Sequence, residues 1–356
     1  MAPLKKNIEC YTADIPIGSY ISEDIFTSGG ALLIRKGTEV NDRVFRSLQN
    51  YMGKVRIDIE VNEDVIIEYD DTEEQDKIFK LSDSIKQRTL ESIELMYSGD
   101  SPETISNSAM SVADTIMQSL DSSKSVAISV DALKVSDEYT FKHSVDVGAM
   151  AMIIARKLGE TNKFIQDIAL AGVLHDLGKS KIPNEILNKP SKLDDNEWVI
   201  MKQHPVYSYR MIENIDDIPK EVKKAVLEHH ENIDGTGYPL GIKDDMICKM
   251  AKILTIADVY DALVTERPYK EAKNPADALE ILMGMPNKFD LDILKVFINC
   301  VILYPIGSTI KLSNDALCVV LKNNENYPLR PVCQNIVTGE KYDLLNDKNC
   351  LSLVIV

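Results

Sequence analysis

Hydrophobic and polar positions follow different patterns in three successive regions of the chain. Up to about residue 65, short apolar runs alternate with turns. Residues 32–34 and 55–59 have patterns that are typical of strands, and residues 41–51 carry apolar side chains at helical spacing. These features predict a small α+β module at the N-terminus.

The long middle region, from Ile78 to about Met283, has the pattern of a helical bundle. Within it, residues 101–103 and 274–277 each place a capping side chain before a proline and an acid, which predicts a helix start. From about residue 304 the chain becomes strand-like again. The strand-like runs lie at 309–312, 316–321 and 351–356.

These patterns predict a mainly α protein in which a central all-helical bundle is flanked by two smaller parts. A domain boundary is expected in the acidic stretch 64–76, which we interpret as a solvated linker. The predicted segments are an N-terminal α+β regulatory or docking module (1–65), an acidic linker with leading helices (66–130), the helical domain (131–300) and a C-terminal β extension (301–356).

The net charge of −16 argues against a protein that binds polymeric nucleic acid, because such a surface needs many Lys and Arg side chains. A small anionic ligand is still compatible with a few local cations. The six cysteines are scattered, which is typical of reduced thiols in a reducing compartment. Neither a signal peptide nor a membrane-spanning run is found. We therefore expect a cytoplasmic protein without membrane contact.

Candidate chemistry lies entirely in the middle region, which contains all five histidines. These are His143, His175, His204, His229 and His230. His175 and Asp176 follow an apolar run, and Asp258 ends another, so two carboxylates are expected to be buried, where they need strong partners. For any single histidine, a hydrogen-bonded structural role is the simpler interpretation. Together, so many imidazoles and carboxylates favour two metal ions that share one carboxylate.

The order of these residues resembles the HD-GYP domain family of the HD phosphohydrolase superfamily. The matching segments are Lys142-His143-Ser144, His175-Asp176-Leu177-Gly178-Lys179, Lys202-Gln203-His204-Pro205, His229-His230-Glu231-Asn232-Ile233-Asp234-Gly235-Thr236-Gly237-Tyr238-Pro239, Ile256-Ala257-Asp258-Val259-Tyr260-Asp261-Ala262-Leu263 and Arg267-Pro268-Tyr269-Lys270. The resemblance covers roughly residues 130–300. It implies an HD-type helical bundle and a cyclic di-GMP phosphodiesterase.

The resemblance also implies a set of metal ligands. One metal would be bound by His143, His175, Asp176 and Asp258, and the other by Asp176, His204, His229 and His230. Asp176 would then bridge the metals, and a hydroxide activated by both would cleave cyclic di-GMP to pGpG, to GMP or to both. Such ligands suit two divalent transition metals, with Fe or Mn expected first and Zn, Co or Ni also compatible.

Five more residues acquire roles from the resemblance. Lys179 would neutralise charge on the phosphoryl oxygens, and Arg267 and Lys270 would bind the substrate phosphates. Tyr238 would contact the substrate, and Asp261 would orient a ligand imidazole. Simpler interpretations remain open: a solvated lysine, a surface pair, a loop that only positions the histidines, and an acid on a helix surface.

One position departs from the family pattern. Some members bind a third metal through a glutamate four residues before the first histidine, and this position is Tyr139 here. We therefore expect two metals. Three alternatives stay open: the same fold acting on another cyclic dinucleotide or nucleotide, a non-catalytic sensor or interaction protein, and a helical scaffold with buried histidines. A regulatory partner at residues 237–239 or at the N-terminal module, and a homodimer, are also open.

Overall fold

The chain divides into two compact units. The computed structural model describes residues 4–12, 15–27, 30–48, 54–61, 65–79, 81, 83–98, 101–121, 127–128, 139–265 and 272–356. One unit is Asp76–Ile302, and the other joins Met1–Gln75 to Leu303–Val356. The two ends of the chain therefore belong to one unit, although the sequence pattern predicts them as separate segments.

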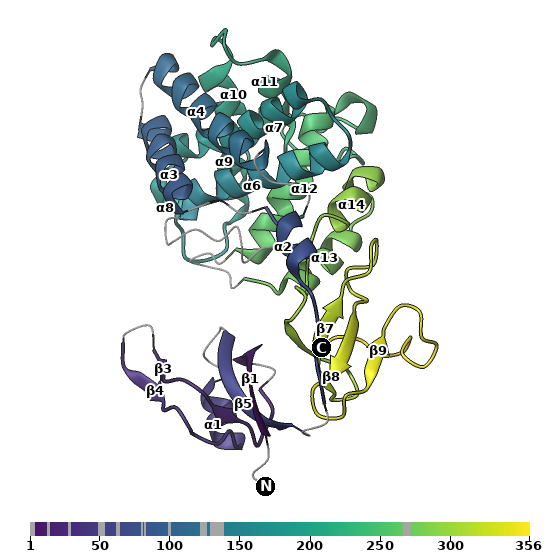
Figure 1. Ribbon diagram of the computed structural model, residues 1–356. Coiled ribbons are helices and arrows are strands. Elements are labelled where there is room, and N and C mark those ends of the chain that lie inside the picture. The colour runs from purple at the N-terminus through teal and green to yellow at the C-terminus, as the bar shows by residue number, and fades with distance from the viewer. Residues whose placement is uncertain are drawn as a thin grey trace. The chain divides into compact units, whose positions relative to one another are not determined.

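Helices form most of the described part of the unit Asp76–Ile302 (Figure 1), as the sequence predicts. Its α-helices are α3 (Asp83–Ser98), α4 (Pro102–Asp121), α6 (Tyr139–Lys157), α7 (Asn162–Leu174), α8 (Asn184–Leu187), α9 (Asp195–Met201), α10 (His204–Ile212), α11 (Lys220–Glu228), α12 (Lys249–Val264), α13 (Pro275–Met283) and α14 (Leu291–Ile298). Two 3-10 helices are η2 (Leu177–Lys181) and η3 (Asp244–Met246), and α2 (Thr72–Lys77) crosses the boundary in sequence. Among the described residues, no helix combines the length and the hydropathy that a bilayer crossing requires.

Helices α6, α7 and α12 form the centre of this unit. Helix α7 packs against α6, α4 and α11, and α12 packs against α6. Every residue of α7 from Asp167 to Leu174 is buried, as expected for a helix that is apolar almost all round. Because the central helices contact neighbours on several sides, the side chains at their ends have well-defined positions.

Local sequence signals determine where several helices begin. Helix α4 starts directly after Ser101, whose hydroxyl accepts the backbone N–H of Thr104. Helix α13 starts after Asn274, whose side chain accepts the backbone N–H of Ala276. Both helix starts agree with the prediction, because a side-chain oxygen satisfies an N–H group that has no partner within the helix.

Short strands and helix α1 (Asp42–Leu48) form the other unit. One sheet has the order β1 (Leu4–Tyr11), β5 (Lys54–Val61), β2 (Tyr20–Ile21), and β3 (Ile25–Phe26) pairs with β4 (Leu32–Ile34). The C-terminal sheet is antiparallel, in the order β6 (Thr309–Lys311), β7 (Leu317–Lys322), β8 (Val332–Asn335), β9 (Lys341–Asp343). The small α+β segment and the C-terminal β extension thus agree with the predicted fold class.

The two ends of the chain share one hydrophobic core. It contains Ile15, Ile21 and Ile57 from the N-terminal segment together with Val319 and Ile336 from the C-terminal one. A short segment alone buries too little apolar surface to be stable. Pooling the apolar side chains of both ends gives a larger core, and this long-range contact leaves no pattern in either local sequence.

The last six residues do not form the predicted strand. Their pairing is limited to an isolated bridge between Leu312 and Ile355. The guanidinium of Arg330 donates to the carbonyl oxygens of Leu353 at 2.6 Å and Leu351 at 3.2 Å. A side chain therefore satisfies acceptors that a neighbouring strand would otherwise use, and the apolar composition alone does not reveal this.

Candidate metal centre

Helix α7 ends at the residue pair His175 and Asp176. His175 is the C-cap of α7, and Asp176 directly precedes η2. The Nδ1 atom of His175 lies 2.7 Å from the carbonyl oxygen of Gly172. Because a carbonyl oxygen only accepts hydrogen bonds, this Nδ1 is the donor, and Nε2 is the nitrogen that faces the centre. The buried imidazole is therefore held in the orientation in which Nε2 can bind a metal.

Three further histidines are held by their Nδ1 atoms in a similar manner. In His204, at the start of α10, and in His229, at the end of α11, Nδ1 lies 2.8 Å from the carbonyl oxygen three residues earlier. In His143, on α6, Nδ1 lies 2.6 Å from Oδ2 of Asp261 on α12. Each of these imidazoles thus has its orientation determined by a group outside the centre, as is usual for metal-binding histidines.

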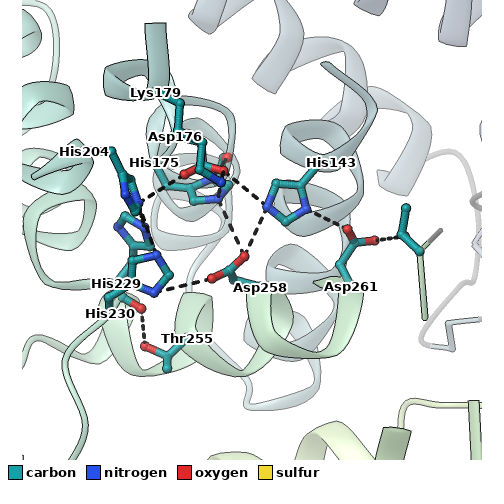
Figure 2. Close-up of polar contacts among 12 residues, drawn as sticks. His143, His175, Asp176, Lys179, His204, His229, His230, Thr255, Asp258 and Asp261 are labelled. Atoms are coloured by element: carbon teal, nitrogen blue, oxygen red, sulfur yellow. Dashed lines mark hydrogen bonds and ion pairs between the residues drawn. The ribbon is translucent and has the colours of Figure 1, made fainter. Parts of the chain in front are cut away.

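Asp176 lies between two groups of imidazoles (Figure 2). Its Oδ2 atom is 3.4 Å from Nε2 of His143 and 3.3 Å from Nε2 of His175, whereas its Oδ1 atom is 3.3 Å from Nε2 of His204. On α12, Oδ1 of Asp258 is 3.1 Å from Nε2 of His143. The two oxygens of Asp176 therefore face different histidines, which is the arrangement that a bridging carboxylate needs.

The ligand atoms form three overlapping triads, each with all atoms within 4.8 Å of one another. The triads are His143, His175 and Asp258; His204, His229 and His230; and His175, Asp176 and His229. Among the described residues, Nε2 of His143, Nε2 of His175 and Oδ1 of Asp176 are buried without an aligned hydrogen bond. Leaving such atoms unsatisfied costs about 1–3 kcal/mol each. Bound cations would satisfy them, so the residues present fit a pair of metal ions.

The imidazoles of His204, His229 and His230 are neutral near pH 7. Burial lowers the pKa of His204 to about 3 and the pKa of His230 to about 4. Burial and the neighbouring imidazoles hold the pKa of His229 well below its ordinary value. Neutral imidazole is the form that binds metals, because protonation removes the lone pair.

Lys179 forms an ion pair with the carboxylate at the middle of the centre. Its Nζ atom lies 2.5 Å from Oδ2 of Asp176. Burial alone would raise the pKa of Asp176, but His175 and Lys179 outweigh that effect and hold the pKa well below its ordinary value. Asp176 is therefore an anion, and Lys179 is a cation placed within the centre and 21% exposed at its side chain.

The η2 turn that carries Asp176 and Lys179 packs directly on α10. A Cβ atom on Gly178 would lie 2.2 Å from the carbonyl oxygen of His204, so a side chain does not fit here. The hydroxyl of Ser208 accepts the N–H of Gly178 and donates to the carbonyl oxygen of His175, both at 2.7 Å. This contact links the backbone of one histidine group to the helix of the other.

Sequence analysis missed three buried residues that support the ligands. Ser208 is described above, and the hydroxyl of Thr255 donates to the carbonyl oxygen of His229 at 2.8 Å. Glu231 accepts backbone N–H groups of the loop that follows the paired histidines. The available signal was a hydrophilic residue on an otherwise apolar helix face, as for Thr255 within residues 253–257. Their partners, however, are distant backbone atoms that sequence spacing does not identify.

The structure describes some of the other predicted site residues and leaves others outside the described ranges. Asp261 is 3% exposed and contacts His143, which excludes a helix-surface acid and agrees with an orienting role. The ring of Tyr238 contacts that of His230. Arg267 and Lys270 lie outside the described residues, as does the side chain of Tyr139.

Part of the helical unit matches the model of a known protein family. Residues 127–293 match the family model described as HD domain. Over these residues the helical unit is therefore similar to the HD domain family, as the sequence resemblance implies.

Three curated relatives are similar to this chain over part of their length. Cyclic di-GMP phosphodiesterase PA4108 of Pseudomonas aeruginosa is 37% identical over 63% of this chain and 54% of its own length. Cyclic di-GMP phosphodiesterase PdeB of Borreliella burgdorferi is 28% identical over 61% of this chain and 56% of its own. The 3'3'-cGAMP-specific phosphodiesterase 3 of Vibrio cholerae is 39% identical over 40% of this chain and 31% of its own. The chain thus spans about half the length of the first two relatives and about a third of the length of the third.

Proposed function

We propose that this protein is a metal-dependent phosphodiesterase that hydrolyses cyclic di-GMP to pGpG, to GMP or to both. The observation that carries the proposal is the position of Asp176, whose two oxygens face two separate groups of buried imidazoles. Two metals about 3.5–4 Å apart are a recurrent device for phosphoester hydrolysis. The names of PA4108 and PdeB support cyclic di-GMP as the substrate.

In this proposal the ligands form two half-sites that share Asp176. One half-site consists of His143, His175, Asp176 and Asp258, and the other of Asp176, His204, His229 and His230. When bound, two divalent ions would supply Lewis acidity and a water activated for attack on phosphorus. Imidazole and carboxylate ligands without a thiolate suit Mn or Fe, and are compatible with Zn, Co or Ni.

Residues around the ligands have supporting roles in the same proposal. Lys179, held 2.5 Å from Asp176, would place its positive charge where negative charge grows on the phosphoryl oxygens. Asp261 would keep His143 in the orientation that presents Nε2 to the metal. Arg267 and Lys270 would bind the substrate phosphates, the arginine through its planar guanidinium.

A second candidate substrate has an observation in its favour. The relative from Vibrio cholerae that is named for 3'3'-cGAMP is 39% identical to this chain over 144 residues. The metal ligands determine the type of reaction, whereas base recognition depends on contacts beyond them. The same centre acting on 3'3'-cGAMP is therefore the alternative to test beside cyclic di-GMP.

The test is hydrolysis by the purified full chain after anaerobic loading with Mn²⁺ or Fe²⁺. Cyclic di-GMP and 3'3'-cGAMP are supplied in parallel, products are separated by chromatography, and Asp176→Ala serves as the inactive control. We expect metal-dependent turnover of cyclic di-GMP that a chelator abolishes. Faster turnover of 3'3'-cGAMP would replace the substrate, and dinucleotide binding without turnover would identify a sensor. Failure to retain Mn, Fe or Zn would contradict the metal centre itself.

A further inference from the structure

One histidine of the centre is held differently from the other four. The imidazoles of His143, His175, His204 and His229 each have Nδ1 within 2.8 Å of an acceptor. In His230, Nδ1 is 3.6 Å from Oδ2 of Asp258, which is too long for a hydrogen bond, and Nε2 is 3.1 Å from Nε2 of His204. Both ring nitrogens thus face other proposed ligands. In the part of the chain that the structure describes, no group outside the ligand set forms a hydrogen bond with this ring.

The His230 ring instead lies against an aromatic ring. Tyr238 stacks on it with ring centroids 4.7 Å apart and planes inclined by 29°. The contact matters because the side chain of His230 is 21% exposed, whereas the side chains of His143, His175 and His204 are at most 3% exposed. An imidazole with one open side and no outer hydrogen bond needs another contact to limit its rotation. A stacked ring determines the plane of the imidazole and limits this rotation.

The loop that carries Tyr238 is fixed to the backbone beside His230. The N–H of Tyr238 donates to the carbonyl oxygen of His230 at 3.1 Å. The carboxylate of Glu231, which is 2% exposed, accepts the N–H groups of Leu240 at 2.6 Å and Gly241 at 3.1 Å. The loop is therefore anchored at the tyrosine and again two and three residues after it.

Close packing beneath the tyrosine adds a second constraint. A Cβ atom on Gly237 would lie 2.5 Å from the Cα atom of Glu231 and 2.5 Å from the carbonyl oxygen of His230. The loop backbone therefore rests directly on the residues that follow α11. At the C-terminal end of α9, Nζ of Lys202 lies 5.6 Å from the centroid of the Tyr238 ring, within the range of a cation–π contact.

We propose that Tyr238 is a positioning residue for His230, and that Glu231 anchors the loop that holds it there. In this role the stacked ring replaces the outer hydrogen bond that orients each of the other four histidines. The inference rests on the proposed binuclear centre and concerns one half of it, the half-site with His204, His229 and His230. Loss of the stack should weaken the binding of the metal in that half-site and leave the other half-site unchanged.

The test measures Mn²⁺ binding to metal-free protein by titration calorimetry, with metal content after desalting as a second readout. Wild type should bind two equivalents. Tyr238→Leu should lower the affinity for one of them by about 10-fold, the lower end of the effect of removing an orienting partner. Tyr238→Phe, which keeps the ring, should bind both with wild-type affinities. Tyr327→Leu is the matched control, because Tyr327 is 54% exposed and belongs to the other compact unit.

Glu231 gives an independent variant of the same test. Glu231→Ala should reproduce the weakened equivalent, whereas Glu231→Gln keeps an oxygen that can accept the two loop N–H groups and should restore it. Circular dichroism identifies any variant that does not fold. Tyr238→Met, which also lacks a ring, takes the place of Tyr238→Leu in that event.

The outcomes separate this inference from the proposed function. Two equivalents at wild-type affinities in a folded Tyr238→Leu protein would overturn the positioning role. A raised KM for cyclic di-GMP with unchanged Mn²⁺ binding would do the same and make Tyr238 a substrate contact only. If wild type itself binds fewer than two equivalents, the binuclear centre fails, whatever the tyrosine variants show.

Discussion

Glu74 and Asp176 are both buried carboxylates, one in each compact unit, but their neighbours differ in kind. Glu74 is 8% exposed and accepts the backbone N–H of Ile306 at 2.7 Å and the side-chain amide of Asn323 at 2.6 Å. Asp176 is 1% exposed and faces the Nε2 atoms of three histidines as well as Lys179. The same chemical group thus accepts hydrogen bonds from a backbone N–H and a side-chain amide in one unit, and faces histidines in the other.

The difference shows that burial of a charge does not by itself identify a functional site. Both oxygens of Glu74 have donors that the fold supplies, so its burial is compensated within the protein. Among the described residues, Oδ1 of Asp176 has no aligned hydrogen bond although Nε2 of His204 lies 3.3 Å from it. A buried carboxylate whose neighbours are metal-binding groups, and which the fold leaves incompletely satisfied, is the better candidate for function.

Replacing the carboxylate of the metal centre should have the largest effect. Asp176→Ala removes a ligand from both half-sites, so we expect hydrolysis of cyclic di-GMP to fall by more than about 10³-fold, beyond the loss from a single stabilising donor. Metal content, measured by elemental analysis of desalted protein, should fall as well. Turnover near the wild-type rate would contradict the bridging role.

Removing the cation beside Asp176 should separate catalysis from metal binding. Lys179→Ala should lower kcat by about 10²-fold while both metals are retained, because the ammonium is proposed to stabilise the transition state and is not a ligand. The control is Lys163→Ala, which removes a lysine that is 69% exposed and paired with Asp167. Loss of metal from Lys179→Ala would show a structural role instead.

The carboxylate that orients His143 should have a smaller effect, limited to one half-site. Asp261→Ala removes the acceptor 2.6 Å from Nδ1 and should weaken binding of one Mn²⁺ by about 10-fold. Asp261→Asn retains an acceptor oxygen and should recover most of that affinity. Equal binding by all three proteins in titration calorimetry would mean that the contact does not orient the imidazole.

Replacing the structural carboxylate should leave the chemistry unchanged. Glu74→Ala leaves the N–H of Ile306 without its acceptor and removes one of the two acceptors of the Asn323 amide, so the free energy of unfolding should fall by about 2 kcal/mol. Urea unfolding measures this loss, while kcat and Mn content should match wild type. A loss of metal in this variant would mean that the two carboxylates do not have separate roles.

Much of the helical unit was predictable because its signals are local. Apolar spacing indicated the helices, and capping residues marked the starts of α4 and α13. The ordered motifs then pointed to His143, His175 and Asp258, whose ligand atoms lie within 4.8 Å of one another. The order of the motifs along the chain thus predicted which side chains lie close together in space.

Other features depend on residues that are far apart in the chain. The core shared by Ile57 and Val319 joins the two ends, and Ser208 joins the η2 turn to α10. Neither contact has a periodic pattern, because each is formed by side chains whose partners are chosen by packing. The same holds for the terminal run near Leu353, which was predicted as a strand and whose carbonyl oxygen instead accepts a hydrogen bond from the guanidinium of Arg330.

The sequence by itself determined the helical class of the central unit and the residue types available for chemistry, because helical periodicity and side-chain identity are local properties. Only the tertiary structure decided which oxygen of Asp176 faces which histidine. It alone also decided that His230 stacks on Tyr238, whereas each of the other four histidines is oriented by a hydrogen bond. Distances of a few ångströms between side chains from different helices depend on how those helices pack, which no single stretch of the chain encodes.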